Sequence, residues 1–148
     1  MDGLVFVWAG LSIGLAWLWV ALWMWILARM SVDVLGKNPN IVSTLRIYTI
    51  IGIALVESNA IYGLLMSFKI LWTTWVWWLQ AIWAWLAIWL TCLWAGYGEW
   101  KFVAGSLEAL NRNPENKGTV LQFMMLFVAM IEAVSIYWLV ITMNILGK

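Results

Sequence analysis

The sequence has no histidine, one cysteine and two prolines, and only 10% of its 148 residues are charged. With no His and with Cys92 alone in an apolar run, neither a zinc site nor a disulfide framework is expected. The chain lacks a P-loop, a nucleophile elbow and a dinucleotide fingerprint. Its net charge of +1 gives no reason to expect nucleic acid as a partner. We therefore expect no cofactor and no catalytic machinery.

Hydrophobic residues dominate, at 66% of the chain. Soluble domains carry about 25% charged residues, whereas a membrane-crossing helix needs about 20 mostly apolar residues. Four segments meet that requirement, roughly 3–35, 40–70, 71–110 and 115–146. The segments are separated by polar stretches at 36–40 and 111–118 and by a short turn near Lys69, Thr73 and Thr74. The sequence predicts an all-α protein that crosses a lipid bilayer four times.

The chain also repeats itself. Matching residues lie 75 positions apart: Asn38 and Asn113, Pro39 and Pro114, Glu57 and Glu132, and Tyr62 and Tyr137. An internal repeat of this kind indicates duplicated structural units. We predict two tandem helical hairpins, residues 1–71 and 72–148, in the same orientation. Their polar loops, 36–40 and 111–118, then share one membrane face.

Each predicted hairpin carries a carboxylate near the middle of its second helix, Glu57 or Glu132. A charged side chain at the bilayer centre costs at least about 2.5 kcal/mol. Two such residues at matching positions indicate ion or proton handling. Most basic residues flank the polar loops, and the positive-inside rule then places the loops in the cytoplasm and both termini on the opposite side.

These motifs resemble the c-subunit of rotary ATP synthases, the proteolipid of the rotating membrane ring. The loop motifs are Lys37-Asn38-Pro39 and Arg112-Asn113-Pro114, and the second-helix motifs are ALVESNAIYGL (54–64) and AMIEAVSIYWL (129–139). The resemblance implies a closed ring of many copies that translocates H⁺ or Na⁺ on Glu57 and Glu132. It also implies a stator partner, the a-subunit, and a central stalk that contacts the two loops.

The resemblance further implies ion ligands. Sodium-type members carry Glu-Ser with a Tyr four residues later, as in Glu57, Ser58 and Tyr62, and a Gln or Glu on the first helix. That first-helix position is Glu99 in the second hairpin but Met24 in the first, and Ala133 replaces the Ser beside Glu132. The resemblance thus makes Glu57 the sodium-type site, with Glu57, Ser58 and Glu99 as possible Na⁺ ligands, and Glu132 a proton-type site. Our hypothesis is that Glu57, Ser58, Tyr62 and Glu99 share one pocket between hairpins, with Tyr137 as the second tyrosine of the repeat.

The first helix of each hairpin departs from the Gly-rich pattern of that family, because 14 of the 15 tryptophans lie in or at the ends of these two helices. On the third helix, one face is formed by Trp75, Trp78, Trp85, Trp89 and Trp100, and a small-residue stripe of Ala84, Ala87, Thr91, Ala95 and Gly98 runs roughly opposite. Small residues favour close helix contact. The chain is either a divergent natural member or a redesign of the first and third helices around retained second and fourth helices.

Other readings stay open at this point. The chain is alternatively a structural or designed ring or pore with vestigial carboxylates, or a four-helix ion transporter that acts alone. Ser58 is alternatively bonded to its own helix backbone, and Glu99 paired with Lys101 near the headgroups. Carbodiimide reactivity and oligomer mass separate these functions.

Overall fold

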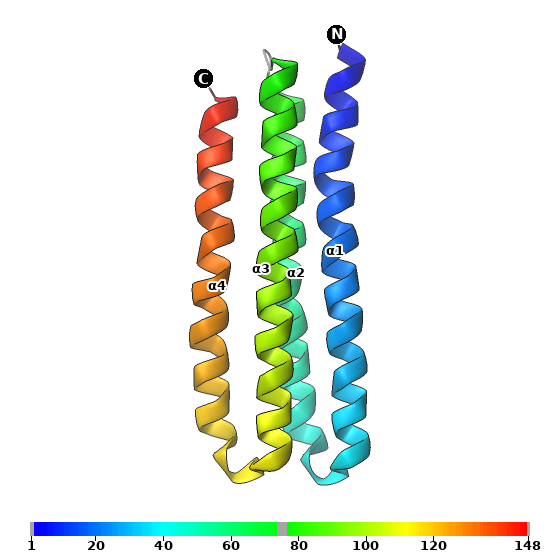
Figure 1. Ribbon diagram of the computed structural model, residues 1–148, viewed down its shortest axis with the longest axis vertical. Coiled ribbons are helices and arrows are strands. Elements are labelled where there is room, and N and C mark those ends of the chain that lie inside the picture. The colour runs from blue at the N-terminus through cyan, green and yellow to red at the C-terminus, as the bar shows by residue number, and fades with distance from the viewer. Residues whose placement is uncertain (1, 74–76, 148) are drawn as a thin grey trace.

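The computed structural model describes residues 2–73 and 77–147. The described residues form four long helices and two short 3₁₀ turns: α1 (Asp2–Lys37), η1 (Pro39–Ile41), α2 (Val42–Trp72), α3 (Trp78–Arg112), η2 (Pro114–Asn116) and α4 (Lys117–Leu146). The helices run side by side along the long axis of the molecule (Figure 1). Each is long and apolar enough to cross a membrane, which confirms the predicted all-α membrane fold.

The two polar loops have the same construction. A non-helical Asn, Asn38 or Asn113, ends the preceding helix, and a Pro then opens the 3₁₀ turn. Proline suits the first position of a helical turn, because a backbone N–H at that position has no partner within the turn and proline lacks this N–H. Both loops lie at one end of the bundle, opposite the two termini (Figure 1). The Asn38 side chain donates to the carbonyl of Asn111 at 3.4 Å, which joins the loops to each other.

The connection at the other end differs from the prediction. The third helix does not begin near Leu71, because α2 continues to Trp72 and α3 begins at Trp78. The predicted turn residue Thr74 and the predicted face residue Trp75 lie outside the described residues. The division of the chain at 71/72 stays a prediction. We refer below to α1 with α2 as hairpin 1, and to α3 with α4 as hairpin 2.

The two hairpins pack along their whole length, with α3 in contact with α1 and α2 as well as with α4. Close approach depends on glycines. A β-carbon at Gly63 would lie 2.5 Å from the Ala16 β-carbon, and one at Gly52 would lie 2.4 Å from Val103. The buried side chains form one cluster toward the loops and a second toward the termini. Polar mid-membrane residues lie between these two clusters.

Tryptophan fills much of the contact between α1 and α3. Trp85 stacks on Trp8 with ring centroids 6.0 Å apart, and Trp100 stacks on Trp23 at 5.9 Å. Aromatic stacking of this kind adds to the energy of buried area. Two members of the predicted Trp face of α3, Trp85 and Trp100, are therefore turned toward α1 within the same chain.

Candidate functional site

Four polar residues, Glu57, Ser58, Asn59 and Tyr62, interrupt the apolar surface of α2 about halfway along its length. Successive residues of an α-helix are turned by about 100°, so Glu57, Ser58 and Asn59 point in different directions. Tyr62, one turn after Ser58, shares the face of Ser58. Asn59 is buried and Glu57 is exposed, while Ser58 and Tyr62 are partly buried. This short segment therefore contributes to more than one environment.

Asn59 connects three helices inside the bundle. Its Nδ2 donates to Oε2 of Glu99 on α3 at 2.7 Å, and its Oδ1 accepts a hydrogen bond from Ser135 on α4 at 2.9 Å. The backbone carbonyl of Asn59 accepts from Cys92 Sγ at 3.1 Å. Asn59, Glu99 and Ser135 are all 0% exposed. In a buried site of low dielectric constant, each hydrogen bond is strong and each unsatisfied polar group is costly.

Glu99 has unused binding capacity. Its Oε1 is buried without a hydrogen-bond partner in the part of the chain that the structure describes. An ionised carboxylate cannot stay buried unpaired at acceptable cost, so Glu99 requires a proton or a cation. Lys101 is not its partner, because Lys101 Nζ lies over the rings of Tyr97 and Trp100 at 5.4 and 5.9 Å.

A second polar contact crosses between the hairpins. The Tyr62 hydroxyl donates to Oε1 of Glu132 on α4 at 2.6 Å, a length typical of a hydroxyl bound to a carboxylate. The sequence placed Tyr62 near Glu57 or Ser58 of its own helix. The structure keeps Tyr62 beside Ser58 and also joins it to the carboxylate of the other hairpin.

Glu57 has a different position. It is exposed on the outside of the bundle, and Tyr137 is 66% exposed. Ser58 Oγ donates to the carbonyl of Leu55 at 2.6 Å, so it has the helix-bonded arrangement that the sequence left open. The pocket predicted for Glu57, Ser58, Tyr62 and Glu99 is not assembled within one chain. The role of each residue in ion binding stays a prediction.

Sequence reasoning missed Asn59, Ser135 and Cys92. Asn59 and Ser135 had a usable signal, because a polar side chain in the middle of a membrane helix usually serves a function. Each also lies within one helical turn of a predicted carboxylate, Glu57 or Glu132. Nothing in the sequence indicated that Cys92 would contact α2.

The loop residues predicted to contact a stalk are largely accessible. Lys37, Pro39, Arg112 and Asn113 are exposed, and Pro114 is partly buried. Asn38 is partly buried through its contact with Asn111. The loops thus present three exposed basic side chains, Lys37, Arg112 and Lys117, at one end of the bundle.

A membrane chain of two like hairpins, with one carboxylate halfway along the second helix of each, defines a duplicated proteolipid-type protein. The family model of the ATP synthase C-subunit matches residues 7–70 and again residues 82–145. The chain belongs to this family and contains its unit twice. The ATP synthase c-subunits of Chloroflexus aurantiacus and Chloroflexus aggregans are each 36% identical over 70 residues, which cover 47% of this chain and 92% of the relative.

Membership in this family confirms the resemblance read from the sequence. It also confirms that the chain is a non-catalytic membrane protein, since the c-subunit is a proteolipid without catalytic function in its complex. Members of the family translocate ions and have no cofactor.

Proposed function

We propose that this chain is one unit of the membrane rotor ring of a rotary ATPase and carries H⁺ or Na⁺ on Glu132 and Glu57. The hydrogen bond from Tyr62 to Glu132 carries the proposal. It builds a carboxylate site from two neighbouring hairpins, so a row of hairpins repeats the site at each junction.

The same pair recurs between copies. Tyr137 lies 75 residues after Tyr62, and Glu57 lies 75 residues before Glu132. Both are exposed in the single chain. In a ring, hairpin 2 of one copy meets hairpin 1 of the next, so Tyr137 of the first copy is set beside Glu57 of the second. Every copy then contributes to one site within the chain and one site between chains.

The two sites have unlike surroundings. Ser135 lies one helical turn after Glu132, and Asn59 lies one turn before Tyr62. Both are buried, and Asn59 bonds to Ser135 and to Glu99. The positions 75 residues away, which would surround Glu57, are Met24, Val134 and Ala60. Oxygen-rich surroundings suit Na⁺, a hard cation, so we assign the sodium-type site to Glu132 and a proton site to Glu57. This reverses the assignment drawn from the Glu-Ser motif, because Tyr62, one turn after Ser58, contacts Glu132.

Transport follows from the cost of exposing a charge to lipid. A carboxylate that leaves an aqueous path must first be neutralised by its ion. The ion is loaded and released next to a stator partner, the predicted a-subunit. The loops with Lys37 and Arg112 lie in the cytoplasm and contact a central stalk, and both termini lie on the other side. A cysteine in place of Asn113, tested with an impermeant maleimide on cells and on inverted vesicles, checks this orientation.

Carbodiimide labelling of the purified complex tests the ion sites, with peptide mass mapping in the presence and absence of Na⁺. We expect the carbodiimide to form adducts on both carboxylates. Na⁺ should slow the labelling of Glu132 only. Glu132→Gln and Glu57→Gln should each remove one adduct, and Glu108→Gln, a control near the loop, should remove neither. Absence of labelling at both positions would leave vestigial carboxylates and support the structural-ring alternative.

A further inference from the structure

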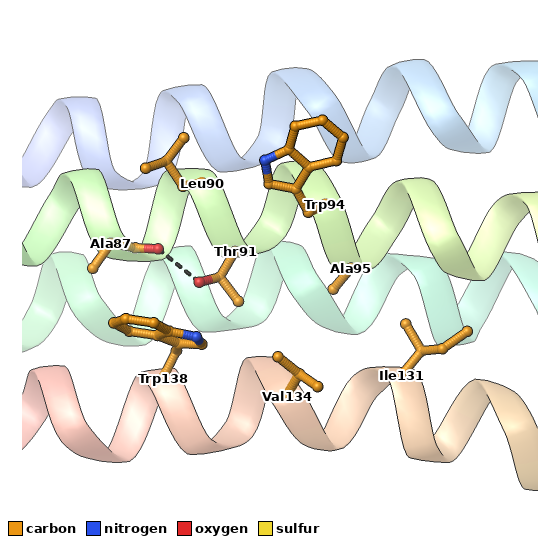
Figure 2. A pocket seen from close by; sticks show the side chains of 8 residues that line it. All are labelled: Ala87, Leu90, Thr91, Trp94, Ala95, Ile131, Val134 and Trp138. Atoms are coloured by element: carbon orange, nitrogen blue, oxygen red, sulfur yellow. Dashed lines mark hydrogen bonds between the residues drawn. The ribbon is translucent and has the colours of Figure 1, made fainter.

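Hairpin 2 has an apolar groove on its surface. The groove has a volume of about 450 Å³ and lies between α3 and α4. Ala87, Thr91 and Ala95 line it from α3, and Ile131, Val134 and Trp138 line it from α4 (Figure 2). The hydroxyl of Thr91 donates to the carbonyl of Ala87 at 2.7 Å, so it needs no partner from outside. The groove therefore suits an apolar side chain.

The repeat shows which kind of surface covers this groove. The residues 75 positions before its lining are Ser12, Ala16, Val20, Val56, Asn59 and Gly63. All six are buried in the chain. Ala16 shares a buried cluster with Cys92 and Ile88 of α3, and Asn59 bonds to Glu99. The groove is thus the face of hairpin 2 that corresponds to the face of hairpin 1 already covered by its neighbour.

The same shift identifies the covering side chain. Within the chain, Cys92 of α3 reaches hairpin 1 and donates to the carbonyl of Asn59 at 3.1 Å. Its counterpart 75 residues earlier is Trp17. The Trp17 side chain is 52% exposed, although its Nε1 already donates to the carbonyl of Ala60 at 3.0 Å. The indole is consequently held in place with its polar atom satisfied and much of its apolar ring uncovered.

A difference in size between the hairpins accounts for the groove. In hairpin 1, Gly63 allows α1 and α2 to approach until Ala16 lies against the α2 backbone. Trp138 occupies the matching position in hairpin 2, and Thr91 matches Ala16. An indole prevents the same approach, which leaves space beside Thr91. The small side chain of Cys92 thus fills the contact within the chain, as a knob. The larger side chain of Trp17 is a knob that matches the larger hole, the groove beside Thr91.

A neighbouring pair on the same two faces has complementary sizes as well. Trp8 stacks on Trp85 inside the chain. The shifted pair is Trp83, which is 66% exposed, and Gly10, beside which a β-carbon would meet no atom within 4 Å. A bulky residue on α3 again corresponds to free space on α1.

We infer that adjacent copies of this chain dock by inserting Trp17 of one copy into the α3/α4 groove of the next. This inference rests on the proposed ring and specifies the contact that closes it. Because the partner is a second copy, every contact between chains in the ring has the same knob and the same hole. The contact differs from the one within each chain, so contacts of two kinds alternate around the ring.

Photocrosslinking from position 17 tests the contact in the assembled complex. With benzoyl-phenylalanine in place of Trp17, we expect chain-to-chain adducts whose peptides map to 87–95 or 131–138. The same crosslinker at Val140 is the control and should not give these adducts. Val140 is exposed but turned by about 200° from Trp138 around α4. Adducts from 17 that map elsewhere in an intact ring overturn the docking contact and leave the ring standing. An unmodified chain that is monomeric by mass overturns the ring itself.

A knob-and-hole exchange provides a second test. Thr91→Trp fills the groove and should lower the ratio of ring to free chain at least about tenfold, whereas Val140→Trp should not change it. The double variant Thr91→Trp with Trp17→Ala moves the knob to the other face and should recover ring assembly. Equal ring yields for Thr91→Trp and Val140→Trp would overturn the inference, as would a double variant that assembles no better than Thr91→Trp alone.

Discussion

Asn59 determines the character of the candidate site at the level of single residues. It lies two positions after the carboxylate that the sequence made prominent, yet it faces the interior and binds Glu99 and Ser135. The exposed Glu57 has none of these neighbours. This network lies within one chain, and we propose that it belongs to the site of Glu132, which Tyr62 contacts one turn after Asn59.

Replacing Asn59 tests this network. Asn59→Ala leaves Glu99 and Ser135 without their partner, and an unpaired buried polar group costs about 1–3 kcal/mol. We expect the free energy of unfolding, measured by titration with a denaturing detergent, to fall by about 2 kcal/mol. Asn144→Ala is the matched control, because Asn144 is exposed and bonds only to its own helix. Equal losses in the two variants would show that the network contributes nothing.

The hydrogen bond between Tyr62 and Glu132 can be tested separately. Tyr62→Phe removes the hydroxyl bonded to Glu132 but keeps the ring. A hydrogen bond to a carboxylate is worth about 1.5–3 kcal/mol, so the Na⁺ concentration that half-protects Glu132 from carbodiimide should rise at least about tenfold. Tyr137→Phe should leave the protection of Glu132 unchanged. The assignment fails if both tyrosine variants alter Glu132 protection equally.

At the level of helices, close packing within hairpin 1 is set by Gly63. Gly63→Ala places a β-carbon 2.5 Å from the β-carbon of Ala16, so the helices must separate. Overpacking typically costs about 1–3 kcal/mol, and we expect that loss of unfolding free energy. Gly118→Ala, where a β-carbon meets open space, should be neutral or stabilising, because alanine is the better helix former. A Gly63→Ala variant as stable as Gly118→Ala would contradict the packing described for α1 and α2.

The helices themselves were predictable from sequence, and their contacts less so. Long apolar runs and the Asn-Pro loops define the four helices because membrane length and proline geometry act locally. The end of α2 was misplaced because only Thr73 and Thr74 interrupt the apolar run there, and tryptophans continue past Trp72. The partners of Tyr62 and Glu99 lie on other helices, 70 and 40 residues away. A helix periodicity gives the direction of a side chain, but only the packing of two hairpins gives its neighbour.

At the level of the whole molecule, the two hairpins are alike in fold but differ in the faces through which they pack. Its two hairpins share a fold and a family motif, but their contact faces differ. Trp138 takes the place in hairpin 2 that Gly63 has in hairpin 1, and Cys92 takes the place of Trp17. One face of hairpin 2 is consequently left open in a single chain. Closed cyclic assembly uses such a face without leaving an unpaired end.

The mass of the detergent-solubilised complex, by native mass spectrometry with direct imaging of the particles, tests the rotor assignment most directly. The proposed ring predicts closed particles of many copies of the 17.0 kDa chain, with two hairpins per copy around the circumference. A monomer or dimer would contradict that assignment and would leave Glu57 and Glu132 as the ion path of a small transporter.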